Sequence, residues 1–309
     1  MKEFLQRESF DIVHVHEPLA PTLPLMVLLH SKSVNVGTFH AARNSNLGYL
    51  SGKPILGHFH GKLDARIAVS PAAAEFISQY FPARYEVIPN GIDTEQFGPH
   101  VEPVRRYVDG RPNILFVGRF NESRKGLKYL LRALALVRQE FPHARLLVVG
   151  PGDPRRYERE LDRAQLTNVV FVGPVDKQGL AAYYATCDIF CAPSTGRESF
   201  GIVLLEAMAS GKPVVATNIR GYSSVVRHRT DGLLVERKNP EALAVALVHL
   251  LADDQLRQRF GEAGRERAAD FSWPVVARRV LETYERTRAR VAEAGTAARL
   301  APPDFASRH

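Results

Sequence analysis

Cysteine, tryptophan and long apolar runs are scarce in this chain of 309 residues. It has only two cysteines and one tryptophan. Cys187 and Cys191 fall on one predicted strand, too far apart along it to form a disulfide, so we expect free thiols in a reducing compartment. No apolar run reaches the length of about 18 residues that a transmembrane helix needs. Residues 1–8 are charged and lack the apolar core of a signal peptide, so we expect a cytoplasmic protein.

Acidic residues are outnumbered by basic ones, 33 against 41, which gives a formal net charge of +8. Such a balance suits anionic partners, among them nucleotide phosphates, acidic lipid headgroups and nucleic acids. Much of the excess lies in arginines along the last predicted helices, which is typical of a solvated helical face. The sequence has no zinc-ligand spacing, recognition-helix pattern or RNA-binding motif, so we expect no nucleic-acid partner.

Short apolar runs alternate with helical periodicity along most of the chain, which predicts parallel α/β sheets. The predicted strands are 11–16, 34–40, 65–70, 85–93, 113–120, 145–150, 169–173, 189–192, 214–217 and 233–235. A proline- and glycine-containing stretch at 94–112 predicts a linker, and a polar stretch at 41–52 predicts a mobile loop. The predicted parts are therefore two domains, a last helix and a disordered tail: 1–110, 111–272, 273–290 and 291–309.

Two glutamates eight positions apart stand out in the second predicted domain. Glu198 precedes a predicted helix and Glu206 lies inside it, among apolar residues where a carboxylate needs a partner. The helix begins near Gly201, where unpaired backbone N–H groups favour an anion and a glycine allows close approach of a ligand. Two glutamates at a fixed spacing also occur in ordinary βα units, so this pattern alone is weak.

Two cations follow the first strand of the same domain. Arg119 ends the strand, and Lys125 lies six residues later on a polar loop. Open α/β sheets bind ligands at the carboxyl edge of their strands, and Arg and Lys both bind phosphate there. The alternative is a basic surface loop without a ligand.

Three histidines, His14, His16 and His40, lie near strand ends in the first domain. A histidine in such a place is most often structural or exposed. His14 and His16 could form a metal pair in principle, but no third ligand stands out. Elsewhere, the glycine pattern at 150–152 lacks the third glycine of a dinucleotide-binding loop, because Arg155 occupies that position.

Several of these segments together resemble the retaining GT-B glycosyltransferases of the GT4 family, glycosyl transferases group 1. The segments are the two-glutamate element, Gly118-Arg119-Phe120 with Lys125, Val13-His14-Val15-His16-Glu17-Pro18, and Thr38-Phe39-His40. The resemblance covers about residues 3–290 and is strongest to bacterial phosphatidylinositol mannosyltransferases. It implies a GT-B fold of two Rossmann-like parallel-sheet domains, with the last helix crossing back onto the first domain.

The resemblance also implies roles for individual residues. His40 and Glu198 are predicted as catalytic, the first contacting the transferred sugar and the second facing the donor sugar. Arg119 and Lys125 are predicted to bind the diphosphate, and Glu206 the ribose. The remaining predicted donor-binding residues lie at the helix start and in the loop that cradles the base: Ser199, Phe200, Gly201, Ile202 and Val175.

The implied activity is retaining transfer of a hexose, with GDP-mannose as the favoured donor and phosphatidylinositol or another lipid or polyol as acceptor. Members of the family need neither a protein-bound metal nor a cofactor, so we expect neither here. The expected partners are the nucleotide-sugar donor, the acceptor and, through peripheral contact, the inner face of the cell membrane.

Members of the family carry a longer segment ahead of the first strand, so we expect a shortened chain with an incomplete N-terminal domain. Two alternatives remain open. One is a nucleotide-sugar-binding remnant without turnover, and the other is a GT-B sugar-nucleotide epimerase.

Overall fold

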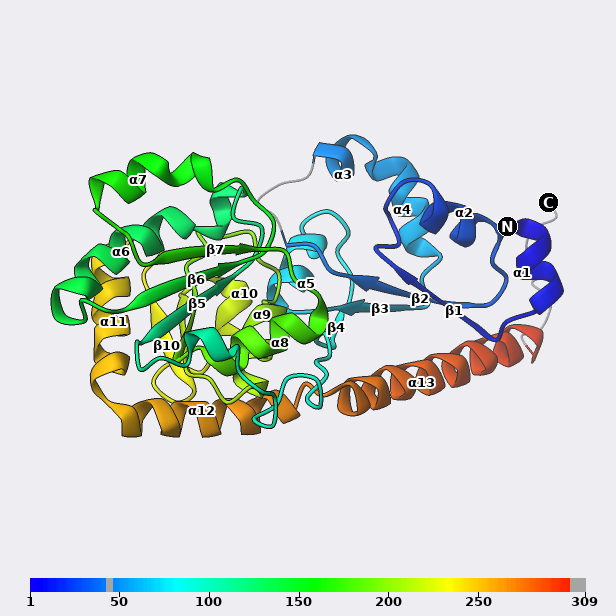
Figure 1. Cartoon of the computed structure of the whole chain (residues 1–309). Coiled ribbons are helices and arrows are strands. Elements are labelled where there is room, and N and C mark those ends of the chain that lie inside the picture. Colours follow the sequence, from blue (N-terminus) through cyan, green and yellow to red (C-terminus); the bar gives the residue numbers. More distant parts are fainter. Residues whose placement is uncertain (43–46, 301–309) are drawn as a thin grey trace. The chain divides into compact units, whose positions relative to one another are not determined.

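The chain forms two compact units (Figure 1). The computed structural model describes residues 1–42 and 47–300, with side chains up to residue 294. The first unit holds Met1–Ile88 and the chain from Val276 onward, and the second holds Pro89–Val275. The boundary between the units therefore lies at residues 88–89, whereas the sequence predicted it at residue 110. Residues 89–110 belong to the second unit, and in this segment the Phe97 ring lies 5.7 Å from that of Tyr184.

The first unit contains a parallel sheet in the order β1-β2-β3-β4. Its strands are β1 (Ile12–His16), β2 (Val34–Phe39), β3 (Ala65–Ala68) and β4 (Glu86–Val87). Its helices are α1 (Lys2–Glu8), α2 (Leu23–His30), α3 (Leu47–Ser51), α4 (Lys53–Gly61), α5 (Pro71–Ser78) and, from Val276 onward, α13 (Trp273–Leu300).

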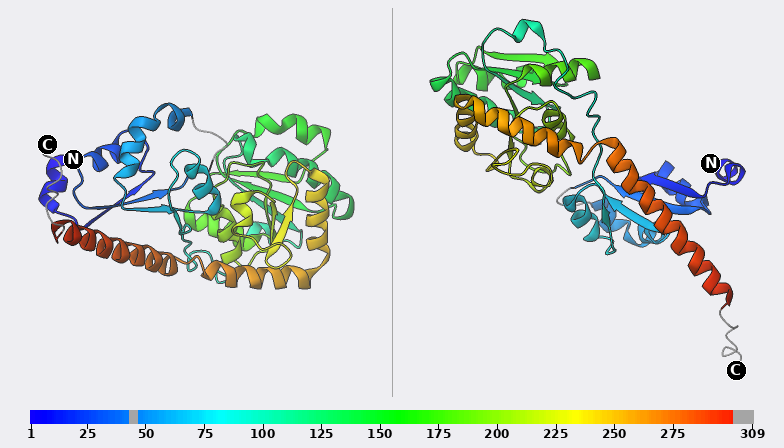
Figure 2. Two further views of the ribbon diagram at one scale, coloured as in Figure 1. Left: turned by 180° about the vertical axis from the view of Figure 1, so that it is seen from behind. Right: turned by 90° about the horizontal axis from the view of Figure 1, so that it is seen from below.

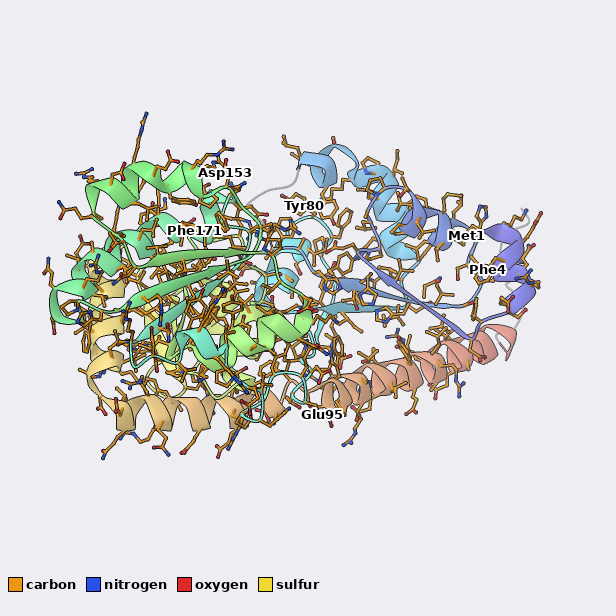
Figure 3. The ribbon with its side chains drawn as sticks, viewed as in Figure 1. Met1, Phe4, Tyr80, Glu95, Asp153 and Phe171 are labelled. Atoms are coloured by element: carbon orange, nitrogen blue, oxygen red, sulfur yellow. The ribbon has the colours of Figure 1, made fainter. Side chains whose placement is uncertain are left out.

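Helices cover both faces of this sheet. On one face, Leu28 of α2 and Phe76 of α5 pack in a buried core with an aromatic group around Tyr80, a residue labelled in Figure 3. On the other face, α13 runs along the strands, as the views in Figure 2 show. Val276 of α13 is buried there against Ile67 of β3.

The second unit is a six-stranded parallel sheet in the order β10-β9-β8-β5-β6-β7. Its strands are β5 (Asn113–Val117), β6 (Arg145–Val149), β7 (Val169–Gly173), β8 (Ile189–Ala192), β9 (Val214–Thr217) and β10 (Gly232–Val235). Its helices are α6 (Leu127–Glu140), α7 (Glu158–Arg163), α8 (Lys177–Thr186), α9 (Ile202–Ala209), α10 (Arg220–Ser223), α11 (Pro240–Ala252) and α12 (Asp254–Ala269), with short 3-10 helices η1 (Arg105–Tyr107), η2 (Ser123–Lys125) and η3 (Pro154–Tyr157).

Local sequence explains where several of these helices begin. Asn239 and Asp253 accept hydrogen bonds from the N–H groups of Ala242 and Leu256, each at 2.8 Å, and so cap α11 and α12. The apolar faces of α6 and α11 then form one buried core against one face of the sheet. Tyr184 of α8 packs on the opposite face, with its ring 5.4 Å from Phe190 of β8.

The structure corrects the sequence-based boundaries in three places. Residues 47–51, expected in a mobile loop, form α3, which Tyr49 anchors in the core; residues 43–46 lie outside the described chain. The fourth strand is two residues long, Glu86–Val87, where 85–93 was predicted. The last helix continues to Leu300 through residues assigned to a disordered tail, because the stretch is rich in alanine. Residues 301–309 lie outside the described chain.

Among the described residues, no helix combines the length and apolar character needed to cross a membrane. The longest, α13, carries arginines along its whole course. Cys187 and Cys191 are both free and buried, as predicted, but only Cys191 lies on a strand, because Cys187 is the residue that ends α8.

Two histidines of the first unit are held in the neutral form. His14 shares hydrogen bonds of 2.7 Å with the hydroxyls of Tyr284 and Thr38, and His60 shares one of 2.8 Å with Tyr85. Burial, aided by neighbouring cations or histidines, lowers the pKa of both His14 and His60 from 6.5 to about 4. Protonation of either ring therefore opposes folding of this unit.

Acid should consequently destabilise the chain before its carboxylates titrate. The unfolded histidines bind protons below pH 6.5, whereas the folded ones stay neutral to about pH 4. The stability is therefore complete above pH 6.5 and falls as the pH drops towards 4. Urea unfolding across this window measures the loss. His14→Gln should show a smaller loss than the wild type, and His58→Gln, at an exposed position on α4, should show the full loss. A urea midpoint independent of pH in the wild type would contradict this account.

Candidate functional site

Two loops meet at the carboxyl edge of the second sheet, one after β5 and one after β8, which are neighbours in the sheet. The N–H of Thr195 in the second loop donates to the carbonyl of Arg124 in the first, at 2.7 Å. Gly126 ends the first loop with φ of 78°, and a Cβ there would lie 1.9 Å from the carbonyl oxygen of Pro193. Only glycine allows this approach, so Gly126 brings the two loops together.

Glu198 is the centre of the contact between the loops. Its Oε1 lies 2.7 Å from Nζ of Lys125 and 2.5 Å from a guanidinium nitrogen of Arg124. Ser194 also donates to this oxygen, at 3.3 Å. Only 14% of the Glu198 side chain and 17% of Lys125 are exposed, so this is a mostly buried, paired charge cluster. Pairs of this kind are strongly perturbed when one partner is removed or drawn away.

Arg119 stands apart from this cluster. It pairs with Glu122 at 3.3 Å, and 74% of its side chain is exposed. The structure therefore brings Lys125 and Glu198 together but leaves Arg119 in solvent near the same edge of the sheet. An exposed guanidinium can form a bidentate contact with an anion without first losing a buried partner.

Helix α9 begins at Ile202, four residues after Glu198, and no side chain caps its start. Gly201 has φ of 108°, and a Cβ there would lie 2.8 Å from the Tyr222 ring. Phe200 is buried, with its ring 5.8 Å from that of Phe271, so its side chain belongs to the core. Ser199 is half-buried and Ile202 is exposed. What this segment offers to a ligand is mainly the free N–H groups of the helix start.

Glu206 lies one turn into α9, and its carboxylate has a protein partner. The hydroxyl of Tyr184 donates to Oε2 of Glu206 at 2.8 Å. Burial raises the pKa of Glu206, and the hydrogen bond from Tyr184 partly opposes that rise. The sequence analysis predicted that the buried carboxylate of Glu206 needs a partner. The structure shows that this partner is Tyr184, which the sequence analysis did not identify.

Val175 lies two residues beyond the end of β7. It is half-buried and precedes Asp176, which caps α8 by accepting the N–H of Gly179 at 2.7 Å. Gly173, with φ of 84°, turns the chain at this point. The loop is thus held by its own cap and places backbone groups at the same sheet edge.

Three histidines of the first unit, His14, His16 and His40, form one array. Nδ1 of His16 and Nε2 of His40 are 2.7 Å apart, and the His14 ring stacks on His16 with centroids at 4.6 Å. Glu17 accepts the backbone N–H of His40 at 2.7 Å. The array follows from the parallel pairing of β1 with β2, which places His16 opposite Thr38, two residues before His40. Within residues 1–42 and 47–300, no group of three or more His, Cys, Asp or Glu side chains could hold a metal ion.

Comparison with known proteins places this geometry in a family. The family model "Glycosyltransferase Family 4" matches residues 1–96, and the model "Glycosyl transferases group 1" matches residues 111–253. Phosphatidyl-myo-inositol mannosyltransferase of Mycobacterium tuberculosis strain H37Rv is 37% identical over 293 residues, which cover 92% of this chain and 76% of the relative. This chain belongs to the group 1 glycosyltransferases of family 4. The mannosyltransferase of the same name from Propionibacterium freudenreichii is 36% identical over 92% of this chain and 72% of its own length.

Solved structures of group 1 glycosyltransferases and similar enzymes share the fold. Sucrose-phosphate synthase from Thermosynechococcus elongatus superposes with a TM-score of 0.78 at 27% identity, covering 94% of this chain and 76% of that one. Anabaena HepE in complex with UDP gives a TM-score of 0.80 at 21% identity over 92% of this chain and 81% of that one. The predicted GT-B fold is confirmed, and the chain is a hexosyltransferase of this fold.

Sequence reasoning missed three residues of this glycosyltransferase that carry the cluster. Arg124 binds Glu198 and Tyr184 binds Glu206. Tyr222 shares a hydrogen bond of 2.9 Å with Ser194 and packs against Gly201. Arg124 is adjacent to Lys125 in the sequence and could have been found as a third cation. Tyr184 lies on α8 and Tyr222 on α10, and no sequence pattern around either residue indicates its contact with this site.

The Tyr184 hydroxyl should stabilise the fold through Glu206. We expect Tyr184→Phe to cost about 1–3 kcal/mol of unfolding free energy, the range for leaving a buried polar group unsatisfied. The same change in a Glu206→Gln background should cost clearly less, because the charge that needs the donor is gone. Urea unfolding of the four variants measures the coupling. Tyr129→Phe is the control, since its hydroxyl makes no hydrogen bond within the described chain. Equal costs of Tyr184→Phe in both backgrounds would contradict the assignment.

Proposed function

We propose that this glycosyltransferase transfers a mannosyl residue from GDP-mannose, with retention of configuration, to phosphatidylinositol or a related lipid or polyol at the inner face of the cell membrane. The observation that carries the proposal is the Glu198 carboxylate fixed beside Lys125 and Arg124 at the start of α9. The names of the relatives, which are phosphatidyl-myo-inositol mannosyltransferases, support the choice of sugar and acceptor.

The donor diphosphate is assigned to the cations and the helix start. Arg119, exposed and paired only with Glu122, binds the phosphates, and Lys125 is drawn from Glu198 towards the stronger negative charge as the donor binds. The N–H groups at residues 199–202 bind the same phosphates. Negative charge that develops on the leaving diphosphate is stabilised by both cations, and this stabilisation lowers the barrier.

The two glutamates take different parts of the donor. Once Lys125 turns to phosphate, the carboxylate of Glu198 accepts hydrogen bonds from hydroxyls of the sugar. Glu206 accepts the ribose hydroxyls while Tyr184 holds its second oxygen in place. The loop around Val175 receives the base through backbone groups. His40, positioned by His16 at 2.7 Å, contacts the transferred sugar. The departing phosphate takes the proton of the acceptor hydroxyl, so no covalent protein intermediate is needed.

An epimerase is the second candidate, since it would use the same donor-binding groups. It differs in one respect that can be measured, because an epimerase consumes its nucleotide sugar without an acceptor. Release of GDP from GDP-mannose that depends on phosphatidylinositol supports transfer. Conversion of the nucleotide sugar at the same rate without acceptor would support the epimerase.

The diphosphate assignment predicts a loss of nucleotide affinity. Arg119→Ala and Lys125→Ala should each weaken GDP binding by about 1.5–3 kcal/mol, the range for a charged hydrogen bond, or tenfold and more. Calorimetry on the full chain measures this loss. Arg132→Ala, an exposed arginine on α6, is the matched control and should bind GDP like the wild type. Unchanged affinity in both test variants would remove the cations from the site.

The assignment of the glutamates predicts two different defects. Glu206→Gln should weaken GDP binding, because the ribose loses a charged acceptor. Glu198→Gln should bind GDP nearly as well but turn over far more slowly, because the group facing the sugar has lost its charge. Binding by calorimetry and steady-state rates of mannosyl transfer separate the two. If both variants lost only nucleotide affinity, this division of roles would be wrong.

A further inference from the structure

A polar cavity of about 700 Å³ lies in the first unit at the amino-terminal ends of β3 and β4. The strands of this sheet are parallel, and His40 follows the carboxyl end of β2, so the cavity and His40 lie at opposite edges of one sheet. The cavity is thus separate from the groups assigned to sugar transfer.

The short strand β4 leaves this space open. It pairs with β3 only from Glu86 opposite Ile67 onward. Ala65 and Arg66, the first residues of β3, therefore have no partner in the register of β4 and line the cavity. On the other side the cavity is bounded by α13, which lines it with Arg286 and Arg290.

Positive charge dominates the lining. Four arginines, at positions 66, 84, 286 and 290, face two carboxylates, those of Asp64 and Glu86, which leaves an excess of two positive charges. Both carboxylates are already in use. Glu86 binds Arg286 at 2.7 Å and accepts the Thr283 hydroxyl at 3.0 Å, and Asp64 accepts the N–H of Asn35 at 2.8 Å.

Three of the four arginines have no carboxylate partner within the described chain, and one of these, Arg290, donates to the backbone carbonyl of Asp64. Arg66 donates to the ring and the carbonyl of His60, at 3.2 and 3.0 Å. Arg84 is exposed and makes no hydrogen bond or ion pair with any described residue. Burial lowers the pKa of Arg66; Tyr85 and Asp64 oppose this effect, and the like charge of Arg290 adds to it. Guanidinium groups that face one another across a cavity repel unless an anion lies between them.

We propose that this cavity binds a phosphate group, as a monoester or diester. Guanidinium groups match the oxygens of a phosphate in pairs, and a group with up to two negative charges balances the excess of the lining. The phosphate can belong to a lipid headgroup or to a soluble phosphate ester, since the contacts are the same. Arg286 and Arg290 also attach α13 to the sheet, through Glu86 and the carbonyl of Asp64. Arg84 makes no such contact with α13. A substitution of Arg84 therefore tests phosphate binding without disturbing the attachment of α13.

The test compares two charge reversals on the full chain. Arg84→Glu changes the cavity, and Arg288→Glu changes an exposed arginine of α13 that does not line it. Titration with inorganic phosphate by calorimetry should show affinity at least about tenfold weaker in Arg84→Glu than in Arg288→Glu, the loss expected for a charged hydrogen bond. Phosphate bound in the second unit contributes equally to both variants, so failure of the donor-site assignment does not affect the comparison. Equal affinity in the two variants overturns the proposal.

A second arm identifies the source of the phosphate. Vesicles of phosphatidylcholine with and without phosphatidylinositol are sedimented with the wild type and both variants. Binding to the phosphatidylinositol vesicles that Arg84→Glu loses and Arg288→Glu keeps supports a lipid headgroup. Loss confined to the inorganic phosphate titration supports a soluble phosphate ester. Equal vesicle binding by all three proteins, together with equal phosphate affinity, shows that the arginines serve only to attach α13.

Discussion

The ion pairs of Glu198 with Lys125 and Arg124 depend on one close approach of backbone. Gly126 lets the loop after β5 pass against Pro193 at the end of β8, and this contact brings the carboxylate to its two cations. The rest of the cluster is built around it. Ser194 joins Glu198 to Tyr222, whose ring fixes the turn at Gly201, and α9 then carries Glu206 to Tyr184. An edge assembled in this way is held together by the chain's own ion pairs, so in the proposed function a phosphate would enter by exchanging partners with Glu198.

The sequence predicted most strands of the sheets because they are short, mostly apolar runs separated by helical and loop segments. Glu198, Glu206 and Lys125 could be predicted because polar residues at strand ends and helix starts are unusual in such a pattern. Which of them touch could not be predicted. The pairing of β5 with β8 joins segments about seventy-five residues apart, and no local pattern encodes that pairing. For the same reason the sequence did not show that Arg119 is exposed and that Arg124 is half-buried at the contact with Glu198. The length of β4 and the helix over 47–51 depend on packing in the same way.

The two units treat charge differently. In the second, each cation of the sheet edge is paired with a carboxylate, because Glu122 and Glu198 between them bind Arg119, Arg124 and Lys125. In the first, His14 is kept neutral by burial and hydrogen bonds, while the amino-terminal edge of the sheet collects arginines that outnumber its carboxylates. The overall charge of +8 is therefore not a uniform coating of the surface. Part of the positive charge is concentrated in the cavity beside the short strand β4.

The first unit is made from both ends of the chain, and the second is made from one uninterrupted stretch between them. This arrangement determines the order in which the parts of the two units are synthesised. When Ile88 has emerged, one face of the first sheet has its helices, but the face that Val276 covers, and the Tyr284 hydroxyl that meets His14, do not yet exist. The whole second unit is synthesised in the meantime and can complete its own core. One face of the first sheet therefore stays uncovered until the last helix has been synthesised, so its apolar residues are exposed for longer than those of the second unit.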